Sequence, residues 1–271
     1  MQLEDHLGDI VRKAARAAGV STAAAAKAAG LGTGEFAALL ESGQSVRPLN
    51  SAALAAVLGV DARKLEGIVR GWLPPVQDLG RWRELRVITT ASDGNSVNAF
   101  LLWDVASREA ALFDTGWEAA PVLRMIAAER LQLKHIFLTH SHEDHIAALQ
   151  PLRQAQPAAL CHAGAKAPTH SARSAASLQL GSLRITSWET PGHAHDGMIY
   201  VVEGWPGDAP PVAIVGDTLF AGSVAKGFVS WETLKQKIQE CIFTLPAETL
   251  LCPGHGPLTT VAEEKANNPF F

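Results

Sequence analysis

The side chains best suited to chemistry gather where an apolar stretch of the chain, residues 135–138, comes to an end. The run Thr139-His140-Ser141-His142-Glu143-Asp144-His145 follows and places three imidazoles and the Asp144 carboxylate within six residues. Ligands of these types at this density suit a divalent metal such as zinc, manganese or iron. Three later clusters add the same ligand types beside glycine, at Pro191-Gly192-His193, Gly216-Asp217-Thr218 and Pro253-Gly254-His255-Gly256. Together the four clusters indicate a two-metal hydrolytic site.

Local structure should aim these side chains at a common point. Residues 133–138 have the pattern of a buried strand, so His140 and His142 are expected on the loop that leaves it. Alternate residues of an extended loop point the same way, which lets both imidazoles reach one ion. Asp144 and His145 begin the next predicted helix and, being adjacent, project in other directions toward a second ion. Strand ends of this kind hold ligands rigidly.

The chain from about residue 80 alternates short β-rich runs with helical segments. This mixture predicts sheets covered by helices, an α/β sandwich. We expect helices near 118–130, 143–154 and 230–243, and strands at 84–91, 97–104, 109–114, 135–139, 158–162, 182–188, 198–203, 211–216 and 249–252.

The first part of the chain differs, because it is rich in Ala and Leu and lacks strand-like alternation. We expect helices at 4–18, 21–29, 33–41, 50–58 and 61–70, ended by Trp72-Leu73-Pro74-Pro75. Their predicted N-caps are Ser21, Thr33, Asn50 and Asp61, and their predicted C-terminal stops are Gly19, Gly30, Gly43 and Gly59. Two domains are therefore predicted: an all-α domain, 1–75, and a catalytic domain, 80–271.

The composition of the chain limits the kinds of partner and the location expected for it. The 271 residues carry a net charge of −4, so no basic excess points to nucleic acid. Three scattered cysteines favour reduced thiols over a disulfide framework. The polar, acidic start does not resemble a signal peptide, and no apolar run is long enough for a membrane span. We therefore expect a cytoplasmic protein that does not enter a membrane.

The motif series Thr-His-x-His-x-Asp-His, Pro-Gly-His, Gly-Asp-Thr-Leu-Phe and Pro-Gly-His-Gly resembles the metallo-β-lactamase superfamily. Within it, the chain is most similar to the glyoxalase II (hydroxyacylglutathione hydrolase) branch, from about residue 84 to the C-terminus. The resemblance implies an αββα sandwich with the site at the loop end of the sheets. It also implies that Asp217 bridges two ions, the first held by His140, His142 and His193 and the second by Asp144, His145 and His255.

The chemistry implied is hydrolysis. Two divalent ions, zinc before iron or manganese, lower the pKa of a bound water toward about 7, and the resulting metal-bound hydroxide attacks a carbonyl. The ions also stabilise the oxyanion that forms, and Asp144 is expected to orient the nucleophile. The resemblance implies a small thioester as substrate, with a lactone or another ester as the alternative. Asp217 argues against a true β-lactamase, in which the family often has Cys at this position.

Four further residues are candidates for the site. Lys226 follows Asp217 at the spacing where glyoxalase II has a lysine that binds the glutathione carboxylate, although a solvated surface lysine is the alternative. Phe220 and Trp117 are candidates for an apolar pocket wall. Asp114 matches a position that the superfamily uses near its site, where it either hydrogen-bonds to a ligand or stabilises a turn.

Residues 8 to about 70 resemble the helix-turn-helix domain of phage-repressor type. The second helix of that motif, 33–41, has two acids and no base-reading side chain, so DNA binding is not expected. A module for homodimer formation and a lid over the active site are the two roles considered. The rival functions are a mononuclear iron persulfide dioxygenase of the same superfamily and a DNA-binding regulator whose second domain senses a ligand.

Overall fold

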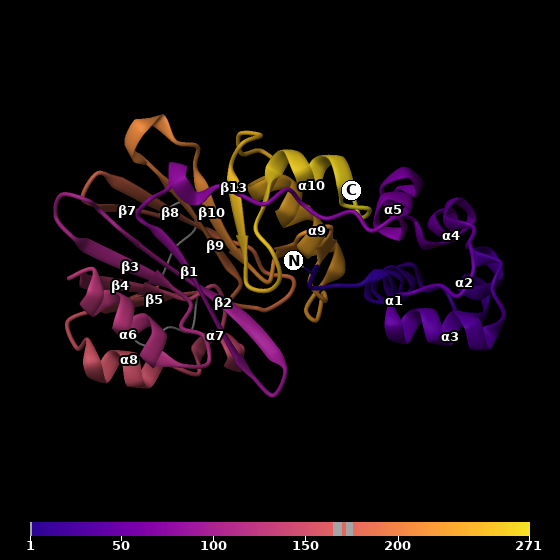
Figure 1. Ribbon diagram of the computed structural model, residues 1–271, viewed down its shortest axis with the longest axis horizontal. Coiled ribbons are helices and arrows are strands. Elements are labelled where there is room, and N and C mark those ends of the chain that lie inside the picture. Colours follow the sequence, from indigo (N-terminus) through magenta and orange to yellow (C-terminus); the bar gives the residue numbers. More distant parts are fainter. Residues whose placement is uncertain (1, 165–169, 172–175) are drawn as a thin grey trace.

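The computed structural model describes residues 2–164, 170–171 and 176–271. Within these residues two six-stranded β-sheets pack face to face, and helices cover their outer faces (Figure 1). The predicted αββα sandwich, preceded by helices, is therefore confirmed.

The first sheet has the strand order β1-β2-β3-β4-β5-β6. Its first three strands are antiparallel, whereas β3 to β6 run parallel. Parallel neighbours are usually joined by helical crossovers; α6 connects β3 to β4, and α7 and α8 connect β4 to β5. The bounds are β1 Leu85–Ser92, β2 Asn95–Trp103, β3 Glu109–Phe113, α6 Ala119–Ala128, β4 Gln132–Phe137, α7 Glu143–Ile146, α8 Leu149–Ala155, β5 Leu160–Ala163 and β6 His170–Ser171.

The second sheet has the order β14-β13-β10-β9-β8-β7, and only β10 and β13 pair in parallel among its described strands. The crossover between β10 and β13 carries a small hairpin, β11–β12, followed by α9 and a π-helix. The bounds are β7 Ala176–Leu180, β8 Leu183–Glu189, β9 Met198–Glu203, β10 Val212–Gly216, β11 Leu219–Phe220, β12 Ser223–Val224, α9 Trp231–Lys237, the π-helix Ile238–Ile242, β13 Leu250–Pro253, β14 Thr259–Thr260 and α10 Val261–Asn267.

The core between the sheets supports the segment that carries the first histidines. Phe113, Phe137 and Tyr200 pack with ring centroids 5.0–5.5 Å apart, in contacts worth about 0.5–1.5 kcal/mol each beyond their burial. The Tyr200 hydroxyl donates a hydrogen bond of 2.6 Å to the carbonyl of Leu138, just before the loop that contains His140. The packed core therefore fixes the start of that loop.

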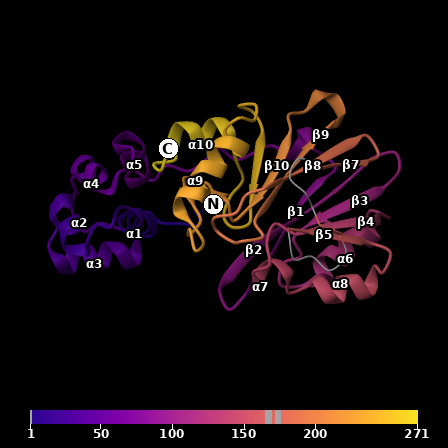
Figure 2. The same cartoon turned by 180° about the vertical axis from the view of Figure 1, so that it is seen from behind.

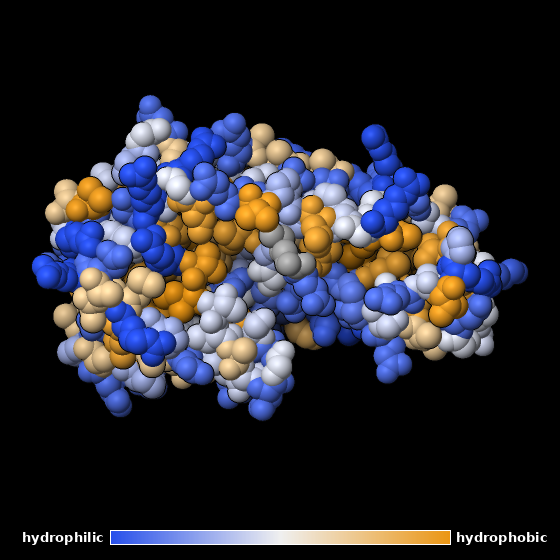
Figure 3. Space-filling model, in the orientation of Figure 1, coloured by the Kyte–Doolittle hydropathy of each residue, from blue (hydrophilic) through white to orange (hydrophobic). Residues whose placement is uncertain are grey.

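The outer faces of the sandwich are covered by different helices. Apolar residues of α6 and α8, among them Val122 and Leu152, pack on the first sheet. On the second sheet, Leu234 of α9 and Val261 of α10 belong to one apolar core with Leu54 and other residues of the first helices. In the face that Figure 3 shows, hydrophobic residues gather over the middle of the molecule and hydrophilic residues over its periphery.

The first five helices form one end of the molecule, beside α9 and α10 in both views (Figures 1 and 2). They are α1 Leu7–Ala18, α2 Thr22–Ala29, α3 Thr33–Ser42, α4 Ser51–Leu58 and α5 Ala62–Val69. We call residues 2–69 the N-terminal helical region. It contacts the C-terminus directly, because the amide of Asp61 donates to the carbonyl of Pro269 (2.8 Å) and Lys64 Nζ donates to the carbonyl of Lys265 (2.8 Å).

The helix ends largely agree with the caps predicted from the sequence. Ser21, Asn50 and Asp61 each accept a backbone hydrogen bond as N-caps, and all four predicted glycine stops have positive φ. The prediction of Thr33 as an N-cap was wrong, because Gly32 occupies that position and its amide donates to Glu35 Oε2 (2.7 Å). A division of the chain into two domains, 1–75 and 80–271, stays a prediction.

The single helix predicted at 143–154 was also wrong, since α7 and α8 are separate. The carbonyl of His145 accepts hydrogen bonds from the amide (2.8 Å) and the hydroxyl (2.9 Å) of Thr115 instead of continuing the helical ladder. The amide of Ala148 donates to the carbonyl of Gly116 (3.1 Å). These tertiary contacts end α7 after one turn and fix the backbone of His145.

Candidate metal centre

The seven predicted ligands come from four loops at one end of the sandwich. His140 and His142 follow β4, and His142 is the N-cap of α7, which carries Asp144 and His145. The remaining ligands follow β8, β10 and β13 and are His193, Asp217 and His255, respectively. The structure brings all seven together in three overlapping groups whose ligand atoms lie within 4.8 Å of one another.

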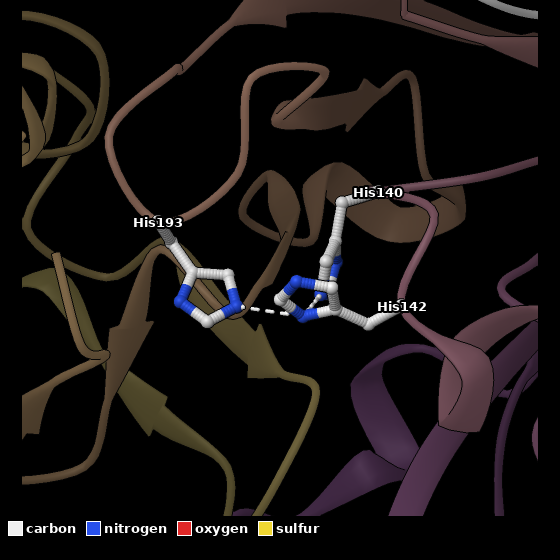
Figure 4. A group of neighbouring side chains, drawn as sticks. All are labelled: His140, His142 and His193. Atoms are coloured by element: carbon white, nitrogen blue, oxygen red, sulfur yellow. Dashed lines mark hydrogen bonds between the residues drawn. The ribbon is translucent and has the colours of Figure 1, made fainter. Parts of the chain in front are cut away.

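The first group consists of three imidazoles. His142 Nδ1 lies 2.9 Å from His140 Nε2 and 3.1 Å from His193 Nε2 (Figure 4). Two nitrogens bound at 2.0–2.1 Å to a tetrahedral zinc lie about 3.3 Å apart, so the spacing suits three ligands of one ion.

The second group combines a carboxylate with two imidazoles. Asp144 Oδ2 lies 3.1 Å from His255 Nε2 and 3.8 Å from His145 Nε2. Asp217, which forms the third group with His140 and His145, faces both of the others: its Oδ1 is 3.3 Å from His145 Nε2, and its Oδ2 is 3.6 Å from His193 Nε2 and 3.5 Å from His255 Nε2. A carboxylate in this position can bridge two ions.

Hydrogen bonds at the far side of three rings fix which nitrogen faces the centre. Nδ1 of His145 donates to Asp114 Oδ2 (2.8 Å), Nδ1 of His193 to the carbonyl of Lys226 (2.9 Å) and Nδ1 of His255 to the carbonyl of Ser96 (2.5 Å). These acceptors carry no proton, so in the neutral form of each ring the proton lies on Nδ1 and the Nε2 lone pair is directed inward. Metal-binding histidines have this arrangement of partners.

Asp114 makes the hydrogen bonds that both of the roles considered for it require. It accepts hydrogen bonds from the amide (2.7 Å) and hydroxyl (2.8 Å) of Thr139 at the start of the ligand loop, and it orients His145. It is fully buried and has a φ of 55°, a conformation that Asp and Asn tolerate better than most residues.

The electrostatics of the centre favour a cation. Burial alone lowers the pKa of His145, yet the carboxylates of Asp114 and Asp217 outweigh burial and raise that pKa to about 10. Burial opposes protonation of His255 too, but hydrogen bonds to Asp144 and Asp217 raise its pKa to about 11. Carboxylates that hold protons so strongly on neighbouring imidazoles also attract metal ions, which compete for the same lone pairs.

Buried polar atoms that make no hydrogen bond provide a further test of whether these residues fit a metal ion. Among the described residues, His145 Nε2 and Asp217 Oδ1 are buried and make no hydrogen bond, although they lie 3.3 Å apart. Buried polar atoms are rarely left without a partner, and both of these are metal-ligand types directed at the same point. The residues present thus fit a divalent metal centre.

A cavity of about 300 Å³ opens over the centre and is lined by some of the predicted substrate-binding residues. Lys226 and Phe220 line it, together with Phe228. Trp117 is not among the lining residues; its indole Nε1 donates to the carbonyl of Asn95 (3.0 Å), and Asn95 lines the cavity.

The sequence did not indicate three other lining residues, Glu4, Asp5 and Lys13. They belong to the N-terminal helical region, far from the metal motifs along the chain. No local signal distinguishes them, because acidic residues before a helix and a lysine within it are typical of ordinary helices.

Comparison of the chain with known proteins shows which superfamily it belongs to. Residues 92–255 match the family model of the metallo-beta-lactamase superfamily. The chain is 32% identical over 200 residues to the probable metallo-hydrolase YqgX of Bacillus subtilis, which covers 64% of this chain and 92% of YqgX. The chain therefore belongs to the metallo-β-lactamase superfamily, whose members bind divalent metals.

A second relative is the hydroxyacylglutathione hydrolase of Fuscovulum blasticum, 35% identical over 167 residues. That match covers 58% of this chain and 61% of the relative, so the chain spans less than two thirds of its length. Among solved structures, ETHE1 from Myxococcus xanthus is similar with a TM-score of 0.60 and 29% identity, over 68% of this chain and 83% of ETHE1. The BLEG-1 B3 metallo-beta-lactamase has a TM-score of 0.59 and 26% identity, over 69% of this chain and 98% of the BLEG-1 chain.

These findings make the chain a metallo-hydrolase of this superfamily, with glyoxalase II-like relatives. Within the described residues, no helix is both long and apolar enough to cross a membrane. Cys161 and Cys252 are buried, and Cys241 is half-buried.

Proposed function

We propose that this chain is a binuclear metal-dependent hydrolase of thioesters. The observation that carries the proposal is the position of Asp217, whose two oxygens face the histidines of both ligand groups. The similarity to a hydroxyacylglutathione hydrolase supports a thioester as the substrate. Zinc suits the mixed imidazole and carboxylate ligands, and iron or manganese would fit the same donors.

Divalent ions bound here would supply an acidified water as nucleophile and stabilise the negative charge that develops on the carbonyl oxygen. The protein's own residues would hold the ions and orient the attacking water. His140, His142 and His193 would hold the first ion, with Asp217 shared between the two. Asp144, His145 and His255 would hold the second.

Asp144 and the cavity wall have separate tasks in this proposal. Asp144 Oδ2 faces His255 and His145, which leaves Oδ1 to accept a hydrogen from the attacking water and so orient it. Phe220 and Phe228 give the cavity apolar wall that excludes bulk water from the acyl group. The departing thiolate is a good leaving group, since thiols ionise with a pKa of about 8.5, and it needs no strong acid beside it.

Lys226 is proposed to bind an anionic group of the substrate at the rim of the cavity. We expect Lys226→Ala to raise KM for an anionic thioester by about tenfold, the worth of one charge-assisted hydrogen bond, with little change for neutral esters. Steady-state kinetics with the two substrate types measures this. Equal effects on both would contradict selective anion binding.

Elemental analysis alongside a panel of thioesters, lactones and simple esters tests the proposed function. The proposal predicts two metal ions per chain and hydrolysis of thioesters that stops when the metal is chelated and returns when it is restored. Preference for lactones would redirect the proposal to a lactonase. One iron per chain with oxygen uptake on glutathione persulfide would overturn it in favour of a dioxygenase.

The two acids of α3 lead us to propose that the N-terminal helical region does not bind DNA. Glu41, which is exposed, and Glu35, which is half-buried, would approach the phosphates of a duplex and be repelled. Sequence-specific, salt-sensitive retention of DNA in an electrophoretic assay would contradict this. Homodimer formation through these helices stays a prediction that measurement of the molecular mass in solution can test.

A further inference from the structure

Helix α1 is fixed to the hairpin β11–β12 by a buried ion pair. Lys13 Nζ pairs with Asp5 Oδ2 and donates to the carbonyl of Val224 (2.7 Å), and the hydroxyl of Ser223 donates to Asp5 Oδ2 (2.5 Å). Lys13 is 9% exposed and Asp5 is 7% exposed. A buried charge pair is costly unless its hydrogen bonds are made, so this arrangement selects one orientation of α1 on the hairpin.

The same hairpin forms part of the metal centre. The Lys13 ammonium lies 5.2 Å from the centroid of the Phe220 ring, and that ring packs edge-on against His255 with centroids 5.8 Å apart. Two residues after the hairpin, the carbonyl of Lys226 accepts the hydrogen bond from His193. The position of α1 is thereby tied to the cavity wall and to two predicted metal ligands.

A second cavity, of about 200 Å³, lies beside the first. Arg16 and Ala17 of α1 line one part of it, and Trp231 and Glu232 of α9 line another. Lys13, Lys226 and Phe228 line both cavities, so the two adjoin at these three residues. We call the second cavity the outer cavity.

The outer cavity is cationic on one side and apolar on another. Arg16 and Lys226 are both exposed, and no described residue forms an ion pair with either of them. Lys13 is neutralised by Asp5, and Glu232 is the acid among the lining residues. Phe228, 60% exposed, and the half-buried Trp231 supply apolar surface. Unpaired cations beside aromatic rings suit a ligand with an apolar body and an anionic end.

We propose that α1 completes the substrate pocket: Arg16 and Lys226 bind an anionic oxygen group, carboxylate or phosphate, at the far end of a substrate whose reactive group lies at the metal centre. The identity of the reactive group rests on the proposed function, whereas binding of the anion does not. The N-terminal helical region is then part of the active site. The planar guanidinium of Arg16 offers two parallel donors to such an anionic group, which a lysine cannot do.

Binding can be measured without turnover, on the full-length, metal-loaded protein. The probes are non-hydrolysable propyl thioethers of mercaptopropionate and mercaptohexanoate, the matching phosphate-ended thioethers and the neutral amides, titrated by calorimetry. We expect Arg16→Ala to weaken binding of the anionic probes by about tenfold and to leave the amides unchanged, while Arg16→Lys restores part of the loss. The carboxylate and phosphate series show which anion is preferred.

Lys27→Ala is the matched control, because Lys27 is also an exposed cation in the last turn of a helix of the same region and does not line the outer cavity. It controls for the alternative that Arg16 only stabilises the C-terminal end of α1 through the helix dipole. We expect no change in probe binding for Lys27→Ala. If Arg16→Ala and Lys27→Ala bind the anionic probes equally, the inference is wrong.

The outcome separates this inference from the proposed function. If the wild-type protein binds the anionic probes selectively through Arg16 but hydrolyses no thioester, the function fails and the inference stands. Hydrolysis of thioesters together with equal affinity for charged and neutral probes would reject the inference alone.

Discussion

We expect Asp217→Ala to abolish metal-dependent hydrolysis and to lower the metal content of the purified protein. The substitution removes the carboxylate that faces His145, His193 and His255, so each ligand group loses a donor at once. Loss of residues that merely support metal ligands costs about 10–100-fold in affinity or activity, and a shared ligand should cost at least the upper value. Elemental analysis and thioester kinetics on the same preparation measure the two effects.

A matched control is Glu248→Ala, which removes an exposed acid, 74% accessible, whose only described partner is Arg81 at 3.7 Å. This variant should retain the metal content and the activity of the wild type. Near-normal turnover by Asp217→Ala would show that the carboxylate does not bridge the ions, however well the variant folds.

Asp114→Asn is expected to weaken metal binding by about 10–100-fold although Asp114 contacts no metal in this account. The amide of Asn would present a donor to His145 Nδ1–H, or to the amide of Thr139, where the carboxylate accepts from both. The imidazole would then favour its proton on Nε2, the nitrogen that must face the metal. Asn tolerates the positive φ of this position, so backbone strain does not explain the loss.

Asp104→Asn controls for the general effect of neutralising a buried carboxylate. Asp104 accepts hydrogen bonds from Ser107 and Ser182 in a loop outside the predicted ligand set, and these bonds hold its pKa below the usual range. Both variants should lose thermal stability, but only Asp114→Asn should lose metal affinity in a competition titration with a chelator. Equal metal affinity for both would mean that Asp114 is a structural residue alone.

The convergence of the seven candidate ligands could be predicted from the sequence because each of the four clusters comes soon after a strand. Strand ends at one edge of a sandwich converge, so the four clusters needed no long-range information beyond the order of the strands. The hydrogen-bond acceptors of His193 and His255 could not be predicted in this way. They are the backbone carbonyls of Lys226 and Ser96, and a backbone carbonyl leaves no mark in the sequence.

Other features depended on contacts between distant segments. Lys13 contacts a carbonyl 211 residues away, so nothing near it in the chain indicates that it lines the cavity. The break between α7 and α8 arises because Thr115 competes for the carbonyl of His145, which outweighs the helical pattern of residues 143–154. The two-residue strands β6, β11, β12 and β14 and the strand β7 were not predicted, since runs this short or this polar carry little periodic signal.

The most direct test of the central claim is a crystal structure of the zinc-loaded protein with anomalous data at the zinc edge. The account predicts two anomalous peaks, about 3.5–4 Å apart, on either side of Asp217, one beside His140, His142 and His193 and the other beside Asp144, His145 and His255. A single peak, or zinc bound only outside this set of seven side chains, would contradict it.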